Sequence, residues 1–551
     1  MGVELYSINE FLGIAQHRDG SLLSTGTAID ARNMDTSDGN LSVAKGYVRR
    51  SSNAIPASSG KILRLIPVDE GNMLAVTQKY IYHGTYSEWN LTPVYTFEAD
   101  LPADCQIGYA LGKINTTNVV VIGTGKTQLI KVNMEDTVTA ELFGSGQYIY
   151  ESTVESYSNK VVTLTDAMSQ EVQIKFVVEG GIYINGTFRA GEVTSDTTIT
   201  LDEAPAIVPA AGDTAKIRGG ASDAHCNFVC MHNGRLFAAG DPENSNRLYW
   251  STIPGDGRTI EHWLAVGSSV DLSGGYVDIG DTTADPIIGM CELSTQILIF
   301  KRYSIYRLYG DRPSYYTVER VERFTENMSN AGVAVKADIP YWLTKSGVKL
   351  FNGADMELLD DGQNFLVSFI DTVKSISQSK GFTARNKLYW TCRVNDGEYD
   401  DSVIIFDTTN GTYMVRDGFN IADMCAFENT IYLINDTGYL YEFDKGDKYD
   451  GKAISAYWQT QPTDLSAKYQ DKQLKHLFFR GDGTTVIIET SNRNNVITTE
   501  RRVLQNEDMI DIPLRSVPCR RFSVKLSNEA GSYFSIQGGL QIFYEGKVRP
   551  L

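Results

Sequence analysis

The sequence predicts an all-β protein, and three observations carry this prediction. Tyrosine (30), phenylalanine (22) and glycine (49) are abundant among the 551 residues, and such a composition favours strands and tight turns. No long stretch rich in Ala, Leu, Glu and Lys repeats with the 3.6-residue period of an amphipathic helix. Short apolar strands, joined in pairs by polar turns, recur along most of a chain that is too long for one ordinary core.

The paired strands recur with a period near 45 residues. Most intervals between their starts are 44 to 46 residues, one is 61, and one is 116, which falls to about 42 when a separate segment of about 74 residues is removed. An all-β unit of this size is typical of a four-stranded blade of a β-propeller. The period predicts about seven blades, with six or eight possible. The seven hairpins begin at Met73, Val119, Arg235, Gln296, Tyr341, Lys387 and Ile431.

Two further β regions break the period. The removed segment contains short apolar stretches at 161–164, 172–177, 182–184 and 197–201, which predict a small β-barrel or β-sandwich inserted in a surface loop of a blade. After about residue 453 the period stops but apolar stretches continue, which predicts a C-terminal β-sandwich. The predicted organisation is an N-terminal arm or closing segment (1–58), blades one and two (59–145), the inserted β domain (146–219), the remaining blades (220–452) and the sandwich (453–551).

One turn of the second hairpin resembles a phosphate-binding loop. Gly123-Thr124-Gly125-Lys126-Thr127 follows an apolar strand, but the motif requires a further glycine where this chain has Val120. The residues after Thr127 continue as a β-rich segment and do not begin a helix that could face an anion. We therefore expect a turn between two strands, and a nucleotide site is the less favoured alternative.

Charge and cysteine content restrict the classes of partner and compartment. A net charge of −18 repels phosphate backbones, so we expect no specific DNA or RNA binding, although an acidic wall would suit a channel through which DNA slides. The simplest interpretation is that the acidity keeps the protein soluble. Seven scattered cysteines are typical of a reducing cytoplasm. We expect no signal peptide and no membrane span, because no apolar run approaches 18 residues.

Two clusters have residue types that bind metals. His225, Cys226, Cys230 and His232 fit no zinc-finger spacing, and we expect the two cysteines to lie in a strand core. Asp444, Asp447 and Asp450-Gly451 lack the alternate-residue oxygen spacing and terminal glutamate of a calcium loop. A solvated turn is the favoured interpretation of this second cluster.

A third cluster has the residue type of glycosidase catalysis. Asp396, Glu398, Asp400 and Asp401 lie in the long turn of the sixth hairpin, and paired carboxylates can hydrolyse glycosidic bonds. Nothing in the sequence orients these groups, and neither a metal spacing nor a nucleophile motif is present. We expect no catalytic, cofactor-binding or metal-binding residues and no enzyme activity, and a propeller glycoside hydrolase or lyase acting on surface glycans is the alternative.

The order of several motifs points to a family. Phe11 and Gly13, Ala28-Ile-Asp-Ala31-Arg-Asn33, the acidic turn 35–39 and Gly46-Tyr47 form an N-terminal pattern. This pattern resembles the N-terminus of tailed-phage tail nozzle, tail hub or tail stabilisation proteins. The stretches 233–256 and 297–311 look like the blade sequences of those proteins, and 478–490 and 520–545 look like their C-terminal sandwich.

The resemblance implies a structural protein of the virion. Such proteins form a ring, usually of six copies, below the portal and adaptor proteins, extend the DNA conduit, and give attachment surfaces for tail fibres or a tail tip. It implies synthesis in the host cytoplasm and assembly into the phage tail. A cellular scaffold of the WD-repeat kind is a further alternative, but it predicts Trp-Asp pairs, and this chain has none.

Overall fold

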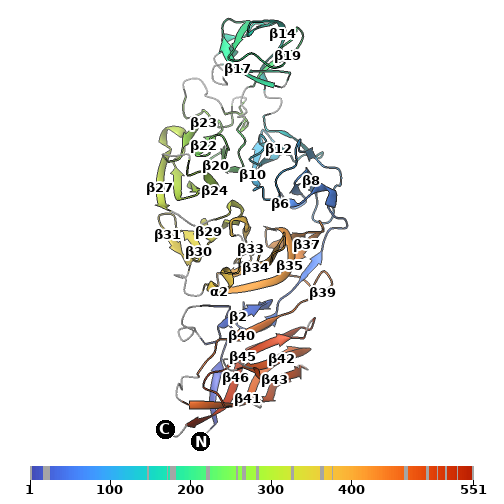
Figure 1. The fold of residues 1–551 in the computed structure, drawn as a ribbon, viewed down its shortest axis with the longest axis vertical. Coiled ribbons are helices and arrows are strands. Elements are labelled where there is room, and N and C mark those ends of the chain that lie inside the picture. Colours follow the sequence, from blue (N-terminus) through green and yellow to red (C-terminus); the bar gives the residue numbers. More distant parts are fainter. Residues whose placement is uncertain are drawn as a thin grey trace. The chain divides into compact units, whose positions relative to one another are not determined.

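The computed structural model is built almost wholly of β-strands (Figure 1). It divides into two compact units, of which the first comprises Met1–Pro93, Glu98–Asp104 and Glu326–Leu551 and the second Val94–Phe97 and Cys105–Thr325. The structure describes residues 3–16, 25–144, 148–170, 172–173, 176, 181–185, 187–218, 224–255, 258–263, 269–280, 284–323, 328–359, 365–374, 376–464, 470–491, 496–504, 507–514, 518–529 and 531–548.

The first unit contains several antiparallel sheets. Its first sheet contains β6 (Ile62–Pro67), β7 (Met73–Thr77) and β8 (Tyr80–Gly84). The next has the order β28-β29-β30-β31 (Ala334–Lys336, Ile339–Leu343, Val348–Phe351 and Met356–Leu358). A third sheet begins with β32-β33-β34-β35 (Gly381–Ala384, Lys387–Cys392, Asp400–Asp407 and Thr412–Phe427).

The long strand β35 pairs with two different strands along its length. Its first half pairs with β34, and its second half pairs with β36 (Thr430–Asn435), which pairs with β37 (Leu440–Phe443). The N-terminal strand β5 (Tyr47–Arg49) then pairs antiparallel with β37 as the fourth strand of this set. Gly418, with φ 91°, lies between the two halves of β35, where the left-handed backbone favours glycine. The short strands β38 (Lys448–Tyr449) and β39 (Lys452–Ala453) complete the sheet.

The second unit holds three four-stranded sheets and a barrel. The sheets are β10 to β13 (Gly108–Ile114, Thr117–Gly123, Ile130–Asn133, Thr139–Leu142), β20 to β23 (Phe228–His232, Arg235–Ala239, Arg247–Trp250, Gly275–Asp278) and β24 to β27 (Ile287–Leu293, Gln296–Lys301, Ser304–Tyr309, Thr317–Arg323). The two-residue strand β9 (Tyr95–Thr96) also belongs to this unit.

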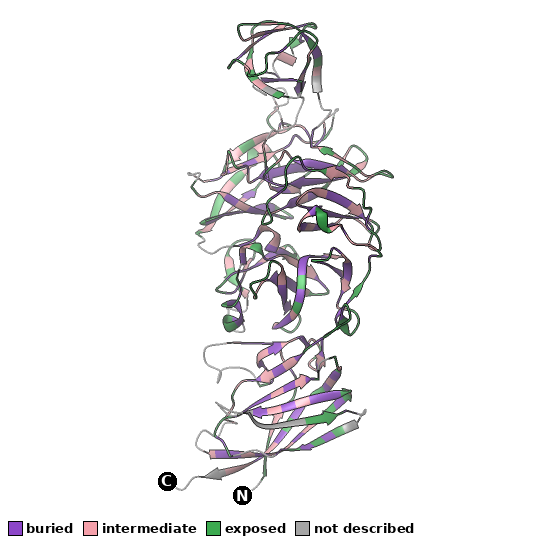
Figure 2. Cartoon of the chain, turned by 45° about the vertical axis from the view of Figure 1, so that its right-hand side comes forward, coloured by how far each residue is buried: buried purple, intermediate pink, exposed green. Residues whose placement is uncertain are grey.

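The sheet of β20 to β23 is buried on both faces. In β20, Phe228 and Cys230 pack with β24 and β25, whereas Val229 and Met231 on the opposite face pack with β10 and β11. Buried residues, purple in Figure 2, accordingly run along the inner strands of the sheets. All seven predicted hairpins are present as antiparallel pairs. The predicted class, an all-β β-propeller with an inserted barrel and a C-terminal sandwich, is confirmed.

The inserted domain is a closed six-stranded barrel. Its strand order is β14-β15-β18-β17-β16-β19 (Tyr148–Ser158, Val161–Leu164, Thr198–Leu201, Thr187–Val193, Gly181–Ile184 and Thr214–Arg218). The predicted strand at 172–177 is wrong, because the described residues Val172, Gln173 and Phe176 are helical. Ser169 Oγ accepts the N–H of Val172 at 3.3 Å, an N-cap that starts a helix, and Phe176 is buried in the barrel core.

Two sheets form the C-terminal sandwich, and the N-terminal arm contributes strands to both. One sheet has the order β3-β4-β46-β41-β44, with β1 paired to β46, and the other has the order β2-β40-β45-β42-β43. The arm strands are β1 (Val3–Ile8), β2 (Ala28–Arg32), β3 (Met34–Asp35) and β4 (Leu41–Val43). The others are β40 (Tyr457–Thr460), β41 (Gln470–Gly483), β42 (Thr485–Ser491), β43 (Val496–Val503), β44 (Glu507–Pro513), β45 (Ser523–Asn528) and β46 (Phe534–Val548).

In the part of the chain that the structure describes, helical structure is confined to short segments, such as α2 (Val367–Ile370). Within the described part of the chain, no helix is long and apolar enough to cross a membrane.

Candidate functional site

Several arm residues that carry the family resemblance are buried in the first unit, among them Phe11, Gly13 and Ala28. The Phe11 ring meets the Trp458 ring edge-on at 5.0 Å between centroids. A Cβ atom at Gly13 would lie 2.2 Å from the carbonyl oxygen of Tyr413, so this close approach of two backbones requires glycine. Ala28 is fully buried. The pattern therefore marks places where the arm packs against strands that lie hundreds of residues later.

Asn33 is the most connected residue of the arm. Its backbone is left-handed (φ 55°) and its side chain is 2% exposed. Its Nδ2 donates to Asp417 Oδ1 at 2.7 Å and to the carbonyl oxygen of Ser455 at 2.8 Å. Its Oδ1 accepts the Asp417 N–H at 2.9 Å and the Tyr449 hydroxyl at 2.8 Å. One side chain thereby joins the arm, β35 and the segment that leads into the sandwich.

Gly46 and Tyr47 bring the arm to the edge of β37. The Tyr47 ring stacks on the Tyr449 ring at 5.3 Å and 11°, and meets the Tyr441 ring edge-on at 4.9 Å. Burial, with the nearby Tyr441, Asp450 and Asp436, raises the pKa of Tyr47 to about 12. Tyr47 also lines a cleft, which makes it both a packing residue and a candidate site residue.

This cleft, which we name the acidic cleft, has a volume of about 460 Å³. Its polar lining includes four carboxylates, three asparagines and one lysine, and its aromatic lining includes Tyr399, Phe419 and Tyr449 in addition to Tyr47. The carboxylates are Glu398, Asp401, Asp436 and Asp450, the asparagines are Asn395, Asn420 and Asn435, and the lysine is Lys452. The structure thus brings part of the 396–401 cluster next to Asp450 of the second acidic turn.

The four carboxylates of the 396–401 cluster have different environments. Asp396 is exposed and lies 3.2 Å from Lys374 Nζ. Asp401 is buried and accepts the backbone N–H groups of Val394 and Asn395 at 3.0 and 2.8 Å, so it holds the turn. The Glu398 side chain is exposed in the cleft. Only Glu398 and Asp401 of this cluster line the cleft.

Asp400, the fourth member, faces a different cluster of charges. Its Oδ2 accepts the Thr391 hydroxyl at 2.6 Å. Burial raises the pKa of Asp400, and Lys380 and Lys61 oppose this rise. The fully buried Asp423 lies 3.6 Å from Lys380 Nζ and accepts the N–H of Leu65 at 2.6 Å. The Asp400 hydrogen bond joins β33 to β34, and the Asp423 hydrogen bond joins β6 to β35, so both carboxylates stabilise contacts between strands.

Two of the three aspartates of the second acidic turn form ion pairs with arginines. Asp444 Oδ1 lies 3.4 Å from the buried Arg416, and its Oδ2 lies 3.0 Å from Arg385. Asp450 Oδ2 contacts Arg49 at 2.9 Å and accepts the Tyr441 hydroxyl at 2.8 Å. Asp447 is exposed. Among the described residues, no group of three or more His, Cys, Asp or Glu side chains is arranged to hold a metal ion.

The Gly123–Thr127 segment is the turn between β11 and β12, as the sequence predicts. The Thr124 hydroxyl accepts the N–H groups of Lys126 and Thr127, both at 3.1 Å. The Gly125 N–H points to the carbonyl oxygen of Cys226 at 3.3 Å. Because these amides bind groups of the chain itself, they do not form the cradle of amides that a phosphate requires.

The cysteine and histidine cluster is dispersed in the second unit. Cys226 is buried in one core and Cys230 packs against another, and burial raises the pKa of both thiols. His232 Nδ1 lies 3.5 Å from Glu292 Oε1. The expectation that both cysteines are core thiols agrees with this packing, although they pack in two cores and do not share one face.

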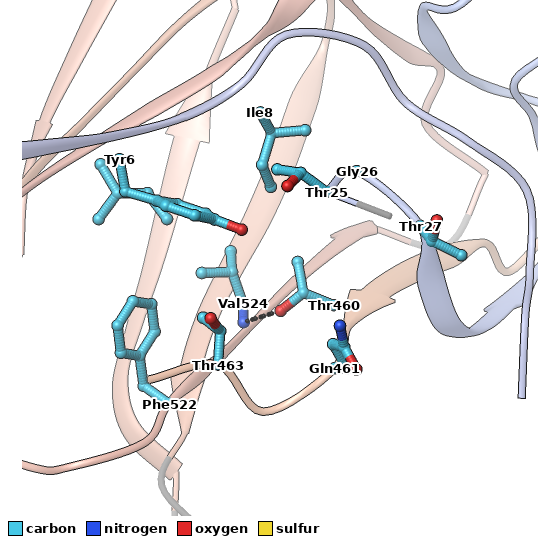
Figure 3. Close-up of a pocket in the computed structure, with 11 residues that line it drawn as sticks. Tyr6, Ile8, Thr25, Gly26, Thr27, Thr460, Gln461, Thr463, Phe522 and Val524 are labelled. Carbon is cyan, nitrogen blue, oxygen red and sulfur yellow. Dashed lines mark hydrogen bonds between the residues drawn. The ribbon is translucent and has the colours of Figure 1, made fainter. Parts of the chain in front are cut away.

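A second pocket lies in the C-terminal sandwich and is lined by Tyr6, Thr25, Gln461 and Phe522, among others (Figure 3). Thr460 Oγ1 there accepts the N–H of Val524 at 3.0 Å. The pocket volume of about 20 Å³ is enough for one water molecule and not for a cofactor.

No family model matches the chain, and no curated protein matches it. Solved structures with which it shares features include Hsv2 of Kluyveromyces lactis (10% identity over 65% of this chain and 98% of that chain, TM-score 0.25). They also include the N-terminal domain of Nup159 (8%, 72% and 95%, TM-score 0.33) and the Pan2 WD40 domain of Neurospora crassa (9%, 74% and 98%, TM-score 0.30). Likenesses at these TM-scores carry no inference about function.

Proposed function

We propose that the chain is a structural virion protein of a tailed phage, a tail nozzle or hub subunit. In this role it forms a ring of six copies that extends the DNA conduit below the portal and adaptor proteins. The ring gives attachment surfaces for tail fibres or a tail tip, and it is assembled from chains made in the host cytoplasm.

The observation that carries the proposal is the position of the N-terminal pattern. Phe11, Gly13, Ala28, Asn33 and Gly46, the residues that resemble tail nozzle proteins, all lie at close contacts between the arm and later strands. The arm pairs with both sheets of the sandwich and with β37. This arrangement suits a conduit subunit whose parts must stay joined, and a net charge of −18 suits a wall along which DNA moves without binding.

Immunogold electron microscopy of phage particles tests the proposal. An antibody against this chain should label the tail just below the head, while a capsid antibody labels the head as a control. Native mass spectrometry of the purified chain should give a mass of six copies. Unlabelled particles together with a monomeric chain would remove the proposal.

The alternative of a glycoside hydrolase has weaker support. Asp400 has the raised pKa of a general acid, but it binds Thr391 and does not line the acidic cleft. Loss of glycan hydrolysis in Asp400→Asn, with hydrolysis in the unmodified chain, would favour the enzyme over the virion protein.

A further inference from the structure

The pocket shown in Figure 3 lies where the N-terminal arm meets the C-terminal sandwich. The arm contributes Tyr6 and Ile8 of β1 together with the segment 25–27. The sandwich contributes residues of both its sheets, among them Thr460 of β40 and Ile542 of β46. A molecule bound in this pocket would therefore contact the arm and the sandwich at once.

One side-chain atom of the pocket is a buried acceptor without a donor. Gln461 Oε1 is inaccessible to solvent and accepts no hydrogen bond from any residue that the structure describes. Leaving a buried amide oxygen unpaired costs the desolvation of that group, and buried polar groups normally have a partner. The unpaired oxygen therefore indicates that a bound molecule in the pocket donates a hydrogen bond to it.

Two hydroxyl groups of the pocket can also take a further partner. The Thr460 hydroxyl accepts the N–H of Val524 at 3.0 Å, and no residue in the described part of the chain accepts its own proton. The Tyr6 phenol points toward Thr25 (Figure 3), and its hydroxyl forms hydrogen bonds with Thr25 and Thr463. A phenolic hydroxyl has one donor site and two acceptor sites, so these two partners leave one site for a third. A small molecule that both donates and accepts hydrogen bonds would satisfy all these groups.

The size and the charge of the pocket select the molecule. Its volume of about 20 Å³ is enough for one water molecule and too small for a larger ligand. Its lining consists of Tyr, Ile, Thr, Gly, Gln, Phe and Val residues, none of which carries a charge at neutral pH. A cation would have no carboxylate beside it to offset the loss of its hydration shell. Water is neutral, has the right size, and both donates and accepts hydrogen bonds.

We propose that the pocket binds one structural water molecule, which donates to Gln461 Oε1, accepts the proton of the Thr460 hydroxyl and forms a third hydrogen bond with the Tyr6 hydroxyl. Buried water molecules typically form about three hydrogen bonds. Because Tyr6 belongs to the arm, whereas Thr460 and Gln461 belong to the sandwich, this water links the two and helps to hold β1 in place. The inference does not depend on the proposed virion role.

A crystal structure of the purified full chain, at a resolution that shows ordered water, tests the site directly. We expect electron density in the pocket at about 2.7–3.2 Å from Gln461 Oε1, Thr460 Oγ1 and the Tyr6 hydroxyl oxygen. An empty pocket in a structure that shows other buried water molecules would overturn the proposal. Contacts clearly shorter than hydrogen bonds, which disappear when sodium salts are replaced by choline salts, would identify a cation and would overturn it as well.

Gln461→Met gives a second test, for which a water-filled pocket and an empty pocket predict opposite results. If water is bound, the change removes one of its hydrogen bonds, so the folding equilibrium constant from urea titrations should fall about fivefold. Amide hydrogen exchange in β1 should also become faster, because the arm loses a link to the sandwich. If the pocket is empty, the change removes an unpaired buried acceptor, so equal or greater stability of Gln461→Met would overturn the proposal.

The matched control is Gln541→Met, because Gln541 is an exposed glutamine of β46 in the same sandwich. This variant should keep the folding equilibrium constant of the unmodified chain and its rates of hydrogen exchange in β1. An equal fall in stability in both variants would assign the effect to the loss of any glutamine from the sandwich, and this result would contradict the proposal.

Discussion

Asn33 and Asp417, which are 384 residues apart, form a reciprocal pair of hydrogen bonds. The Asn33 amide donates to the Asp417 carboxylate, and the Asp417 backbone N–H donates to the Asn33 amide oxygen. The pair joins the N-terminal arm to the middle of β35, at the point where that strand passes from β34 to β36. One asparagine with a left-handed backbone thus fixes a contact between distant parts of the sequence.

Asn33→Ala should destabilise the first unit strongly. The change leaves the Asp417 N–H, the Tyr449 hydroxyl and the Ser455 carbonyl without their buried partner. Unpaired buried groups of this kind cost about 3 kcal/mol together. Denaturant unfolding followed by tryptophan fluorescence measures the loss. Asn115→Ala is the control, because Asn115 has the same left-handed backbone (φ 54°) but is exposed. Equal losses in both variants would assign the effect to backbone strain alone.

Gly46→Ala should displace β5 from β37. A Cβ atom at this position would lie 1.9 Å from the carbonyl oxygen of Lys448, and a backbone atom cannot move aside as a flexible side chain can. We expect a loss of about 2 kcal/mol in unfolding free energy and faster proteolysis of the arm. Gly397→Ala is the matched control, since nothing lies within 4 Å of its Cβ position. Wild-type stability of Gly46→Ala would show that β5 tolerates a shift.

The sequence predicts the repeated part of this fold well, because each hairpin is a local pattern of strand, turn and strand. The sequence identifies Gly123–Thr127 as a turn because a phosphate-binding loop would need a glycine in place of Val120 and a helix after Thr127. The acidic cleft is different, since Tyr47, Glu398 and Asp436 come from three distant segments. Spacing along the chain cannot reveal that these segments meet. The sequence singles out Glu398, Asp401 and Asp450 as members of two acidic clusters and Tyr47 as part of the Gly46-Tyr47 motif, but it does not join them in one cleft. The helix after Ser169 was missed because a single N-cap outweighed the β-propensity of the residues that follow.

The variants Thr124→Val and Lys126→Ala test whether Gly123–Thr127 is a structural turn or a nucleotide-binding site. The Thr124 hydroxyl is the acceptor of two backbone N–H groups and is buried, so its loss should cost about 1.5 kcal/mol in unfolding free energy. The exposed Lys126 should contribute less than about 0.5 kcal/mol. Thermal unfolding checks both values. The reverse order, accompanied by ATP binding that Lys126→Ala abolishes, would restore the phosphate-loop interpretation.

Asp400→Asn should stabilise the first unit in a pH-dependent way. Burial raises the pKa of Asp400 in the folded chain above its unfolded value, so ionisation disfavours the folded state. The stability that protonated Asp400 contributes is fully present below the pKa that this group has in the unfolded chain. It is lost as the pH rises through the pKa that the group has in the folded chain. The asparagine can still accept the Thr391 hydroxyl and carries no charge. The gain in unfolding free energy should therefore be larger at pH 7 than at pH 4, as denaturant titrations at both pH values will measure.

Asp35→Asn is a control for which we expect the opposite change in unfolding free energy. Burial alone would raise the pKa of Asp35, but Arg416 and Lys387 lower it below its ordinary value. The stability from this carboxylate is present above the unfolded pKa and is lost as the pH falls through the folded pKa. Asp35→Asn should therefore lose stability at pH 7 and lose less at pH 3. If both aspartate variants changed in the same direction with pH, the opposing effects of burial and ion pairing assigned to these two carboxylates would be wrong.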